Sequence, residues 1–169
     1  ERFLVENWNP KQGQPKALEG FKPSQRSAME AICARSSHVL VSLPTGEGKS
    51  VLFQVPALCR GLRNRRLTLV ISPLKALMRD QVEGLRDLGF AESVDFLSSD
   101  RPKHEIDVVM QGVLDHRLVL LYVAPERLRS AVFLDVLEKR MRSDAGLDHV
   151  VIDEAHCPRL PMPRDLPHC

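Results

Sequence analysis

The chain has 169 residues, a length that suits one domain, and its 43% apolar and 27% charged residues are typical of a soluble globular protein. It contains neither a signal peptide nor a run of about 20 apolar residues, which excludes a transmembrane helix. The formal net charge of +2 neither requires nor excludes a nucleic-acid partner, because a local basic strip can lie within a neutral total.

The first part of the chain predicts a loop followed by a helix. Residues 1–20 contain two prolines and two glycines, so we expect a loop-rich lead-in. Ser24 can cap a helix that runs from Gln25 to about Arg35, with its apolar residues on one face.

A strand, a glycine loop and a second helix are expected next. Residues 38–43 are mostly apolar and rich in β-branched side chains, which indicates a strand buried on both faces. Pro44 ends this run, and Gly46 and Gly48 permit backbone angles that a β-carbon would forbid. A helix should begin near Gly48 and continue to about Leu62, because apolar residues recur there at helical spacing.

This strand–loop–helix order is typical of a phosphate-binding site, because backbone N–H groups and a helix N-terminus converge on one anion. The loop consists of Thr45, Gly46, Glu47, Gly48, Lys49 and Ser50. Lys49 would neutralise the β- and γ-phosphates of a nucleoside triphosphate, and the Ser50 hydroxyl would bind Mg²⁺. The alternative is an ordinary turn that carries a surface lysine.

Strands and helices then alternate along the rest of the chain. We expect strands at 67–72, 94–97, 118–123 and 149–153, and helices at 74–88, 103–114 and 126–141. Short strands that alternate with helices of 10–15 residues predict an α/β fold, in which helices cover both faces of a mostly parallel sheet.

The last predicted strand ends in two carboxylates, Asp153 and Glu154. Carboxylates at the carboxyl end of a parallel strand point into the crevice where α/β sheets bind ligands. Asp153 would hold Mg²⁺ through water, and Glu154 would orient and deprotonate the attacking water. Taken alone, this block could also be a solvated acidic strand end.

The C-terminal residues differ in character. Residues 158–169 contain four prolines and neither glycine nor an aromatic residue, so we expect an irregular tail. The four cysteines show no C-x-x-C spacing and nothing indicates secretion, so we expect reduced thiols in an intracellular protein. The pairs His156-Cys157 and His168-Cys169 match no usual zinc module. Because the chain begins with Glu1, we expect it to be part of a longer one.

Five blocks in a fixed order resemble the first RecA-like domain of the RecQ family, within the superfamily 2 DNA helicases. The resemblance covers about residues 21–157. The blocks are Phe21–Gln25, Leu43–Ser50, Ile71–Val82, Tyr122–Leu128 and Val151–Cys157, similar to the adenine motif, the phosphate loop and motifs Ia, Ib and II. The general P-loop pattern would need glycine at Leu43, whereas the loop fits the helicase form T-G-x-G-K-S.

The resemblance implies that ATP and Mg²⁺ bind here, and that ATP hydrolysis drives 3′–5′ DNA unwinding in repair and recombination. Gln25 would bind the adenine edge, and Lys22 stands beside it where the family often has arginine. The implied catalytic residues are Lys49, Asp153, Glu154 and His156. The implied contacts to single-stranded or partly duplex DNA are Ser72, Pro73, Leu74, Lys75, Pro125, Glu126 and Arg127. Without the other blocks, Gln25 could be a polar residue at a helix start and Lys75 a solvated charge.

The resemblance ends near Cys157. The sequence beyond it lacks the family's aromatic-rich loop, motif III, the second RecA-like domain with its arginine finger, and the zinc-binding and winged-helix regions. We therefore expect an ATP-binding lobe that is inactive or nearly so alone, in the cytoplasm of a bacterium or the nucleus of a eukaryote. The alternatives are a nucleotide- or nucleic-acid-binding module without turnover and a truncated remnant.

Overall fold

The computed structural model describes residues 20–34, 38–44 and 46–155. The expected lead-in before Gly20, the proline-rich tail, Thr45 and His156 lie outside the described residues. The helices are α2 (Pro23–Ala34), α3 (Val51–Asn64), α4 (Lys75–Leu85), α5 (Lys103–Leu114) and α6 (Ala131–Arg142), with a π-turn η1 (Arg86–Phe90) and a 3₁₀ turn η2 (Pro125–Arg129). The strands are β1 (Leu67–Ile71), β2 (Val94–Leu97), β3 (Leu120–Val123) and β4 (Leu147–Ile152).

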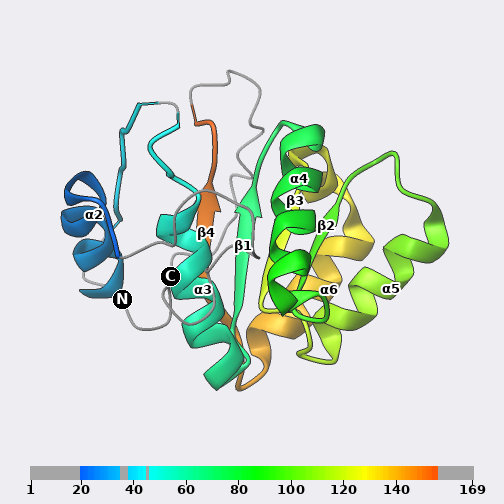
Figure 1. The fold of residues 1–169 in the computed structure, drawn as a ribbon. Coiled ribbons are helices and arrows are strands. Elements are labelled where there is room, and N and C mark those ends of the chain that lie inside the picture. Colours follow the sequence, from blue (N-terminus) through cyan, green and yellow to red (C-terminus); the bar gives the residue numbers. More distant parts are fainter. Residues whose placement is uncertain (1–19, 35–37, 45, 156–169) are drawn as a thin grey trace.

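The four described strands form one parallel sheet in the order β2-β3-β1-β4 (Figure 1). Their carboxyl ends lie at one level, because Ile71 of β1 is opposite both Val123 of β3 and Ile152 of β4. Val123 is in turn opposite Leu97 of β2. The segments that leave the four strands therefore meet at a single edge of the sheet.

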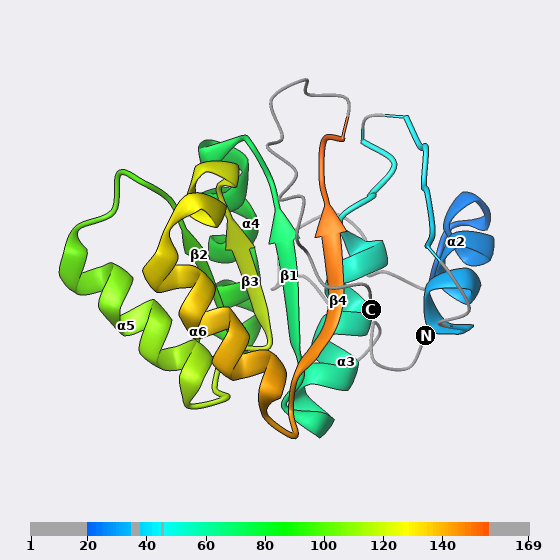
Figure 2. The ribbon, with the colours of Figure 1, turned by 180° about the vertical axis from the view of Figure 1, so that it is seen from behind.

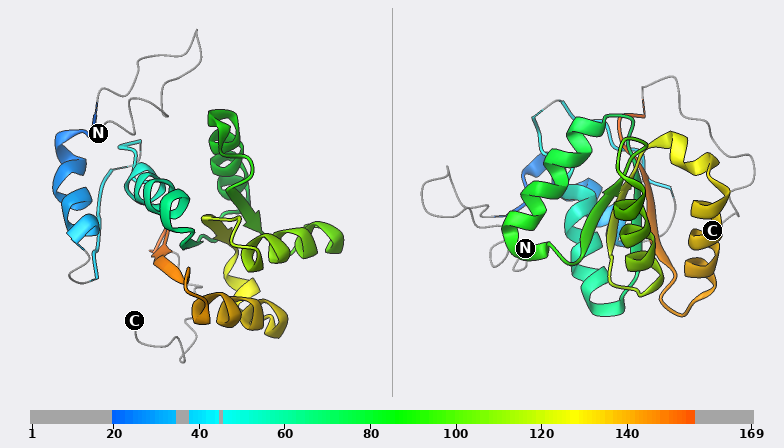
Figure 3. Two further views of the ribbon diagram at one scale, coloured as in Figure 1. Left: turned by 90° about the horizontal axis from the view of Figure 1, so that it is seen from below. Right: turned by 90° about the vertical axis from the view of Figure 1, so that its right-hand side faces the viewer.

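Alternate residues of each strand pack against helices on opposite sides, which confirms the predicted α/β fold. Leu69 and Ile71 of β1 face a core that includes residues of α5 and α6 (Figure 2). Val70 faces a second core that includes residues of α3 and α4. The view from below in Figure 3 shows the two pairs of helices with the sheet between them. This explains why all five residues of β1 are buried.

The strand predicted at 38–43 is wrong. These residues form no strand in the structure, and the side chain of Leu40 is 92% exposed. Val41 and Leu43 instead pack in a small apolar cluster with Met29 of α2 and Leu52 of α3. Packing on helices thus explains why residues 38–43 are apolar. Because they form no strand, β4 pairs with β1 alone among the described strands.

The helix predicted at 126–141 is interrupted at Ser130. This residue has an extended backbone, and its hydroxyl accepts a hydrogen bond from the Phe133 N–H at 3.4 Å, so it caps a new helix, α6. The preceding residues form the separate turn η2. A serine that competes for backbone hydrogen bonds is a common start for a helix and a poor helix interior.

Candidate functional site

The glycine loop leads from the 38–44 segment directly into α3. Gly46 and Gly48 have φ angles of +84° and +74°, in the left-handed region that favours glycine. The N–H of Glu47 donates to the Pro44 carbonyl at 3.2 Å, which closes the first turn of the loop. Helix α3 begins at Val51 with Ser50 at the capping position, slightly later than the start predicted near Gly48. Ser50 therefore lies where the N-terminal end of α3 favours an anion.

The Lys49 ammonium contacts the loop that precedes it. It donates to the carbonyl of Leu43 at 2.9 Å and to that of Pro44 at 3.3 Å. These two contacts place the positive charge of Lys49 beside the two residues that precede the glycine turn. An ammonium has three hydrogens, so phosphate oxygens would share or replace these carbonyl partners.

Hydrogen bonds of the Gln25 side chain join α2 to the glycine loop. Its side chain is 4% exposed, and its Oε1 accepts a hydrogen bond from the Lys22 N–H at 2.9 Å. Its Nε2 donates to the carbonyl of Glu47 at 2.8 Å and to that of Gly48 at 3.3 Å. The Lys22 ammonium also pairs with the Glu47 carboxylate at 3.2 Å. Both amide hydrogens of Gln25 are thus engaged by the loop, and its contact with adenine stays a prediction.

Asp153 lies at the tip of β4, beside the end of β1. Its N–H donates to the Ile71 carbonyl at 2.9 Å, and its Oδ2 accepts a hydrogen bond from the Ser72 hydroxyl at 3.5 Å. Burial raises the pKa of the Asp153 carboxyl, and the neighbouring charge of Glu154 raises it further. The positive charge of Lys49 acts in the opposite direction and is the smallest of these effects.

Glu154 has a left-handed backbone, with a φ angle of +51°. Such a conformation is uncommon in a residue that is not glycine, and strain of this kind concentrates at functional sites. The chain thus turns just beyond the end of β4.

The described residues contain no group of three or more histidine, cysteine or acidic side chains that could enclose a metal ion. Mg²⁺ usually binds one or two protein oxygens and takes its remaining ligands from phosphates and water. Ser50 and Asp153 supply oxygens of that kind. Asp153 is also partly desolvated, so its carboxylate would gain from a cation.

The two segments expected to contact DNA are joined by side chains at the same edge. Lys75, at the start of α4, donates to the Ser99 hydroxyl at 2.7 Å and lies 3.7 Å from the Glu126 carboxylate. Ser99 in turn donates to Glu126 at 2.9 Å, and Asp100 lies 3.5 Å from the Lys75 ammonium. Ser99 and Asp100 belong to no motif, although both follow the strand predicted at 94–97 at its carboxyl end.

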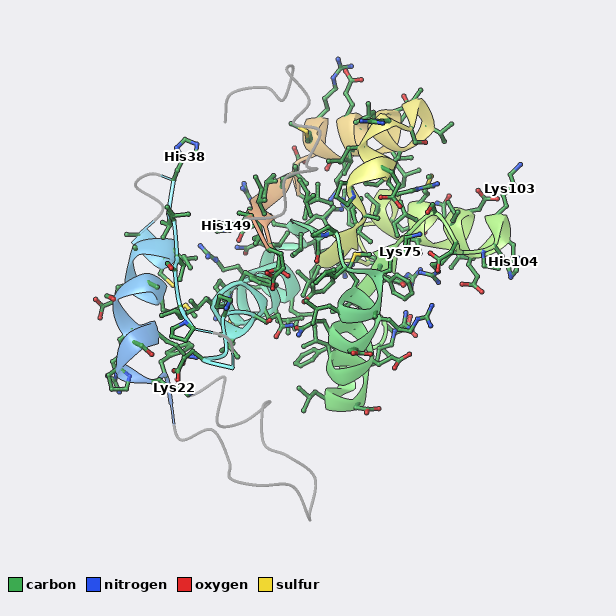
Figure 4. The ribbon with its side chains drawn as sticks, turned by 90° about the horizontal axis from the view of Figure 1, so that it is seen from above. Lys22, His38, Lys75, Lys103, His104 and His149 are labelled. Carbon is green, nitrogen blue, oxygen red and sulfur yellow. The ribbon has the colours of Figure 1, made fainter. Side chains whose placement is uncertain are left out.

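The other residues of these segments differ in their exposure. Ser72 and Pro125 are buried, Leu74 is 48% exposed, and Pro73 and Arg127 are half-buried. The exposed part of this edge therefore consists mainly of Leu74, Lys75 and Glu126. Viewed from above, Lys22 and Lys75 lie on either side of α3 (Figure 4). The adenine segment and the motif Ia segment thus flank the helix that begins at the glycine loop.

Comparison with known proteins identifies the family. The family model described as "DEAD/DEAH box helicase" matches residues 22–160. The chain belongs to this family. Within the DEAD/DEAH box helicases it is 41% identical over 143 residues to the "Putative ATP-dependent DNA helicase Q1" of Caenorhabditis elegans. The aligned region covers 83% of this chain and 21% of that protein.

Relatives from other organisms carry similar names. The "ATP-dependent DNA helicase RecQ" of Bacillus subtilis is 35% identical over 82% of this chain and 22% of that protein. The "ATP-dependent helicase SGS1" of Saccharomyces cerevisiae is 35% identical over 83% of this chain and 10% of that protein. The resemblance to RecQ-type helicases is confirmed, and the chain spans about a tenth to a fifth of the length of these relatives.

Among the described residues, no helix is long and apolar enough to span a membrane.

Proposed function

We propose that this chain is the N-terminal ATP-binding lobe of a RecQ-like DNA helicase. The observation that carries the proposal is the position of two charged residues. Lys49 lies at the glycine turn that leads into α3, which packs on the sheet, and Asp153 lies at the tip of β4, where its N–H donates to the end of β1. A triphosphate between them would find a cation, a helix N-terminus and a desolvated carboxylate at one edge of the sheet. Residues 22–25 would place the base beside α2.

Each residue of the site has a distinct role in this proposal. Lys49 would transfer from the carbonyls of Leu43 and Pro44 to the β- and γ-phosphates and neutralise them. Ser50 and Asp153 would hold Mg²⁺, which supplies charge stabilisation to the phosphates. Glu154 would orient a water molecule and accept its proton during attack on the γ-phosphate, next to His156.

Single-stranded DNA would lie along the exposed part of the same edge. Lys75 supplies a positive charge for a phosphate group, and the Ser72–Lys75 and Pro125–Arg127 segments supply backbone groups. In the complete protein, a second RecA-like domain would add an arginine finger, which typically contributes about 10³–10⁵ in rate. Hydrolysis would then drive 3′–5′ unwinding inside the cell, in the cytoplasm of a bacterium or the nucleus of a eukaryote, in repair and recombination.

The first test measures nucleotide affinity with a fluorescent ATP analogue and Mg²⁺. Lys49→Ala should weaken binding about tenfold or more, a loss of at least about 1.4 kcal/mol, because the phosphates lose their cation. Lys103→Ala is the matched control, since Lys103 is exposed and lies at the outer end of α5 (Figure 4). Equal affinities for these two variants would refute the proposed phosphate site.

The second test separates binding from turnover. Glu154→Gln should keep the affinity for the ATP analogue and remove any hydrolysis, because the amide cannot accept the proton. We expect the isolated chain to hydrolyse ATP slowly, and robust unwinding by it alone would contradict this. Nucleotide binding with no hydrolysis, even beside an added second domain, would favour the non-catalytic binding module instead.

A further inference from the structure

A hollow of about 570 Å³ lies where the C-terminal ends of three helices meet. Arg63 and Arg65 line it from the end of α3, Arg142 lines it from the end of α6, and His116 lines it from the turn after α5. Its one acidic lining residue is Asp144. We call it the arginine hollow, because three of its lining side chains are guanidinium groups.

The arginine hollow lies at the amino edge of the sheet. Strands β1 and β4 begin at Leu67 and Leu147, which are opposite each other, and both strands follow residues of the hollow within a few positions. In Figure 1 α3 and α6 end at the lower edge of the molecule, where these two strands begin. The five residues of β1 span roughly 17 Å. A ligand in the hollow would therefore be distinct from the proposed nucleotide at the carboxyl edge.

The hollow carries an excess of positive charge. Within the part of the chain that the structure describes, neither Arg63 nor Arg65 forms an ion pair, and both side chains are exposed. Arg142 differs, because its guanidinium pairs with the Glu138 carboxylate at 2.6 Å. Asp144 can balance only one of the two remaining charges.

A buried guanidinium adds to this charge. Arg140 is 1% exposed, and it donates to the carbonyls of Arg65 and Val113, the latter at 3.3 Å. Its Nε has no hydrogen-bond partner among the described residues. Burial lowers the pKa of Arg140 to about 10 with no carboxylate acting against it, so the group stays charged at neutral pH. A buried cation without a counter-charge is unfavourable, and an anion in the hollow would reduce that cost.

Arg140 also fixes the two turns that carry the exposed lining. The Val113 carbonyl accepts from Arg140 and from the His116 N–H, each at 3.3 Å. The Arg140 guanidinium thus joins the end of α3 to the turn after α5. Arg65 and His116 have left-handed backbones, with φ angles of +54° and +58°, in positions where helices usually end in glycine. The hollow is therefore held in one shape before any ligand arrives, which lowers the entropy lost on binding.

The chemistry of the lining suits a nucleic-acid backbone. Guanidinium groups bind phosphate through paired N–H donors, and serine and asparagine side chains commonly add to such contacts. Ser143 and Asn64 also line the hollow. A peptide partner would need apolar or aromatic anchors, whereas Ala145 is the one aliphatic lining residue. Phosphate contacts of this kind carry no base sequence information.

We propose that the arginine hollow is a second nucleic-acid site, in which Arg63 and Arg65 bind phosphates of one backbone and Arg140 positions Arg65. This goes beyond the proposed function, because the site uses neither the nucleotide nor Lys75. The chain would then hold nucleic acid at both edges of its sheet.

His116 gives a local probe of the hollow. The chain has six histidines, so the imidazole signals are few in an NMR spectrum, and His116→Gln identifies the one that belongs to this residue. We expect oligo-dT, added without nucleotide, to shift this signal in the wild type and equally in Lys75→Ala. A duplex with the same number of phosphates is titrated in parallel, and a shift with either form supports the site.

Arginine variants test the contacts. Arg63→Gln should lower the slope of log affinity against log salt concentration, taken from the His116 titration, by about 0.7, the contribution of one phosphate contact. The double variant Arg63→Gln, Arg65→Gln should lose the shift. The matched control removes the same charge elsewhere, through Lys103→Gln and Lys139→Gln at two exposed positions, and should behave as the wild type.

Three results would overturn the inference. The first is a wild-type His116 signal that responds to neither form of DNA. The second is an equal response to poly-glutamate at matched charge and ionic strength, which would indicate an acidic peptide or general attraction of anions. The third is a double variant that melts at a lower temperature and keeps the shift, because the arginines would then serve only the negative ends of the helices. Loss of the ATP site alone would refute the proposed function and leave the His116 response unchanged.

Discussion

A β-carbon at Gly48 would lie 2.8 Å from Nε2 of Gln25, closer than real β-carbons approach another heavy atom. The same amide donates to the carbonyls of Glu47 and Gly48. A side chain at residue 48 would therefore have to displace the amide at the end of the Gln25 side chain. The geometry of the proposed phosphate site thus depends partly on Gln25, which lies 23 positions before Gly48 in the chain.

Gly48→Ala should weaken binding of the ATP analogue roughly tenfold or more. The added methyl group adopts a strained φ of +74° and displaces the Gln25 amide, and overpacking of this kind costs about 1–3 kcal/mol. Gly46→Ala separates the two causes, because Gly46 has a similar positive φ but open space around its β-position. Equal losses in the two variants, measured by fluorescence titration, would show that the contact with Gln25 is irrelevant.

Asp153→Asn should stabilise the fold at neutral pH while it weakens magnesium-dependent nucleotide binding. The folded chain raises the pKa of this carboxyl, so the folded state binds its proton more tightly than the unfolded state does. The contribution of Asp153 to the free energy of unfolding therefore falls as the pH rises through the raised pKa of its carboxyl. Above that pKa the carboxylate is ionised, and its burial is unfavourable. Asparagine avoids this cost.

The decisive measurement is how the increase in the free energy of unfolding of Asp153→Asn depends on pH. Urea unfolding should show a higher free energy for Asp153→Asn at pH 7, and a difference that shrinks towards pH about 3, where the carboxyl is protonated in both states. A gain that is independent of pH would contradict the electrostatic explanation.

Gly61→Ala should destabilise the fold by about 1–3 kcal/mol. A β-carbon at this position of α3 would lie 2.5 Å from Cβ of Val119 and 2.9 Å from the Arg66 carbonyl, so the helix would have to move away from the sheet. Gly84→Ala in α4 meets no atom within 4 Å and should stabilise by about 0.5–1 kcal/mol. Urea unfolding of both variants tests this, and destabilisation by both would indicate that helix propensity is not the controlling factor.

Lys75→Ala should weaken binding of oligo-dT and reduce its dependence on salt. Each phosphate contact to single-stranded nucleic acid contributes about 0.7 to the slope of log affinity against log salt concentration. The control is Lys139→Ala, since Lys139 is an exposed residue of α6 that pairs with Asp135 at 2.7 Å. Fluorescence anisotropy over a range of salt concentrations should show a lower slope only for Lys75→Ala.

Periodic patterns were enough to predict most of the fold. The alternation of short apolar strands with amphipathic helices gave the parallel sheet and its helical layers, because strands buried on both faces need no other signal. The same reasoning failed at residues 38–43, where Val41 and Leu43 pack on α2 and α3. An apolar run indicates that side chains are buried, but it does not indicate whether the backbone pairs with a neighbouring strand.

The candidate site could be proposed from the sequence where its residues are local in the chain. The glycine loop and the carboxylates at the end of β4 are short motifs, and parallel strands bring their ends together. Ser99 and the hydrogen bonds of Arg140 were missed, because they depend on which helices and loops become neighbours in space. Those contacts join residues 27 or more positions apart in the chain.

The outer side of β4 has a practical consequence for every experiment above. Within the described sheet β4 pairs only with β1, and its Val150 and Ile152 side chains are 42% and 38% exposed. A strand with a free edge and apolar side chains is a template for the addition of another extended peptide. We therefore expect that self-association of the isolated chain at high concentration would begin at this edge, which light scattering over a range of concentrations would test.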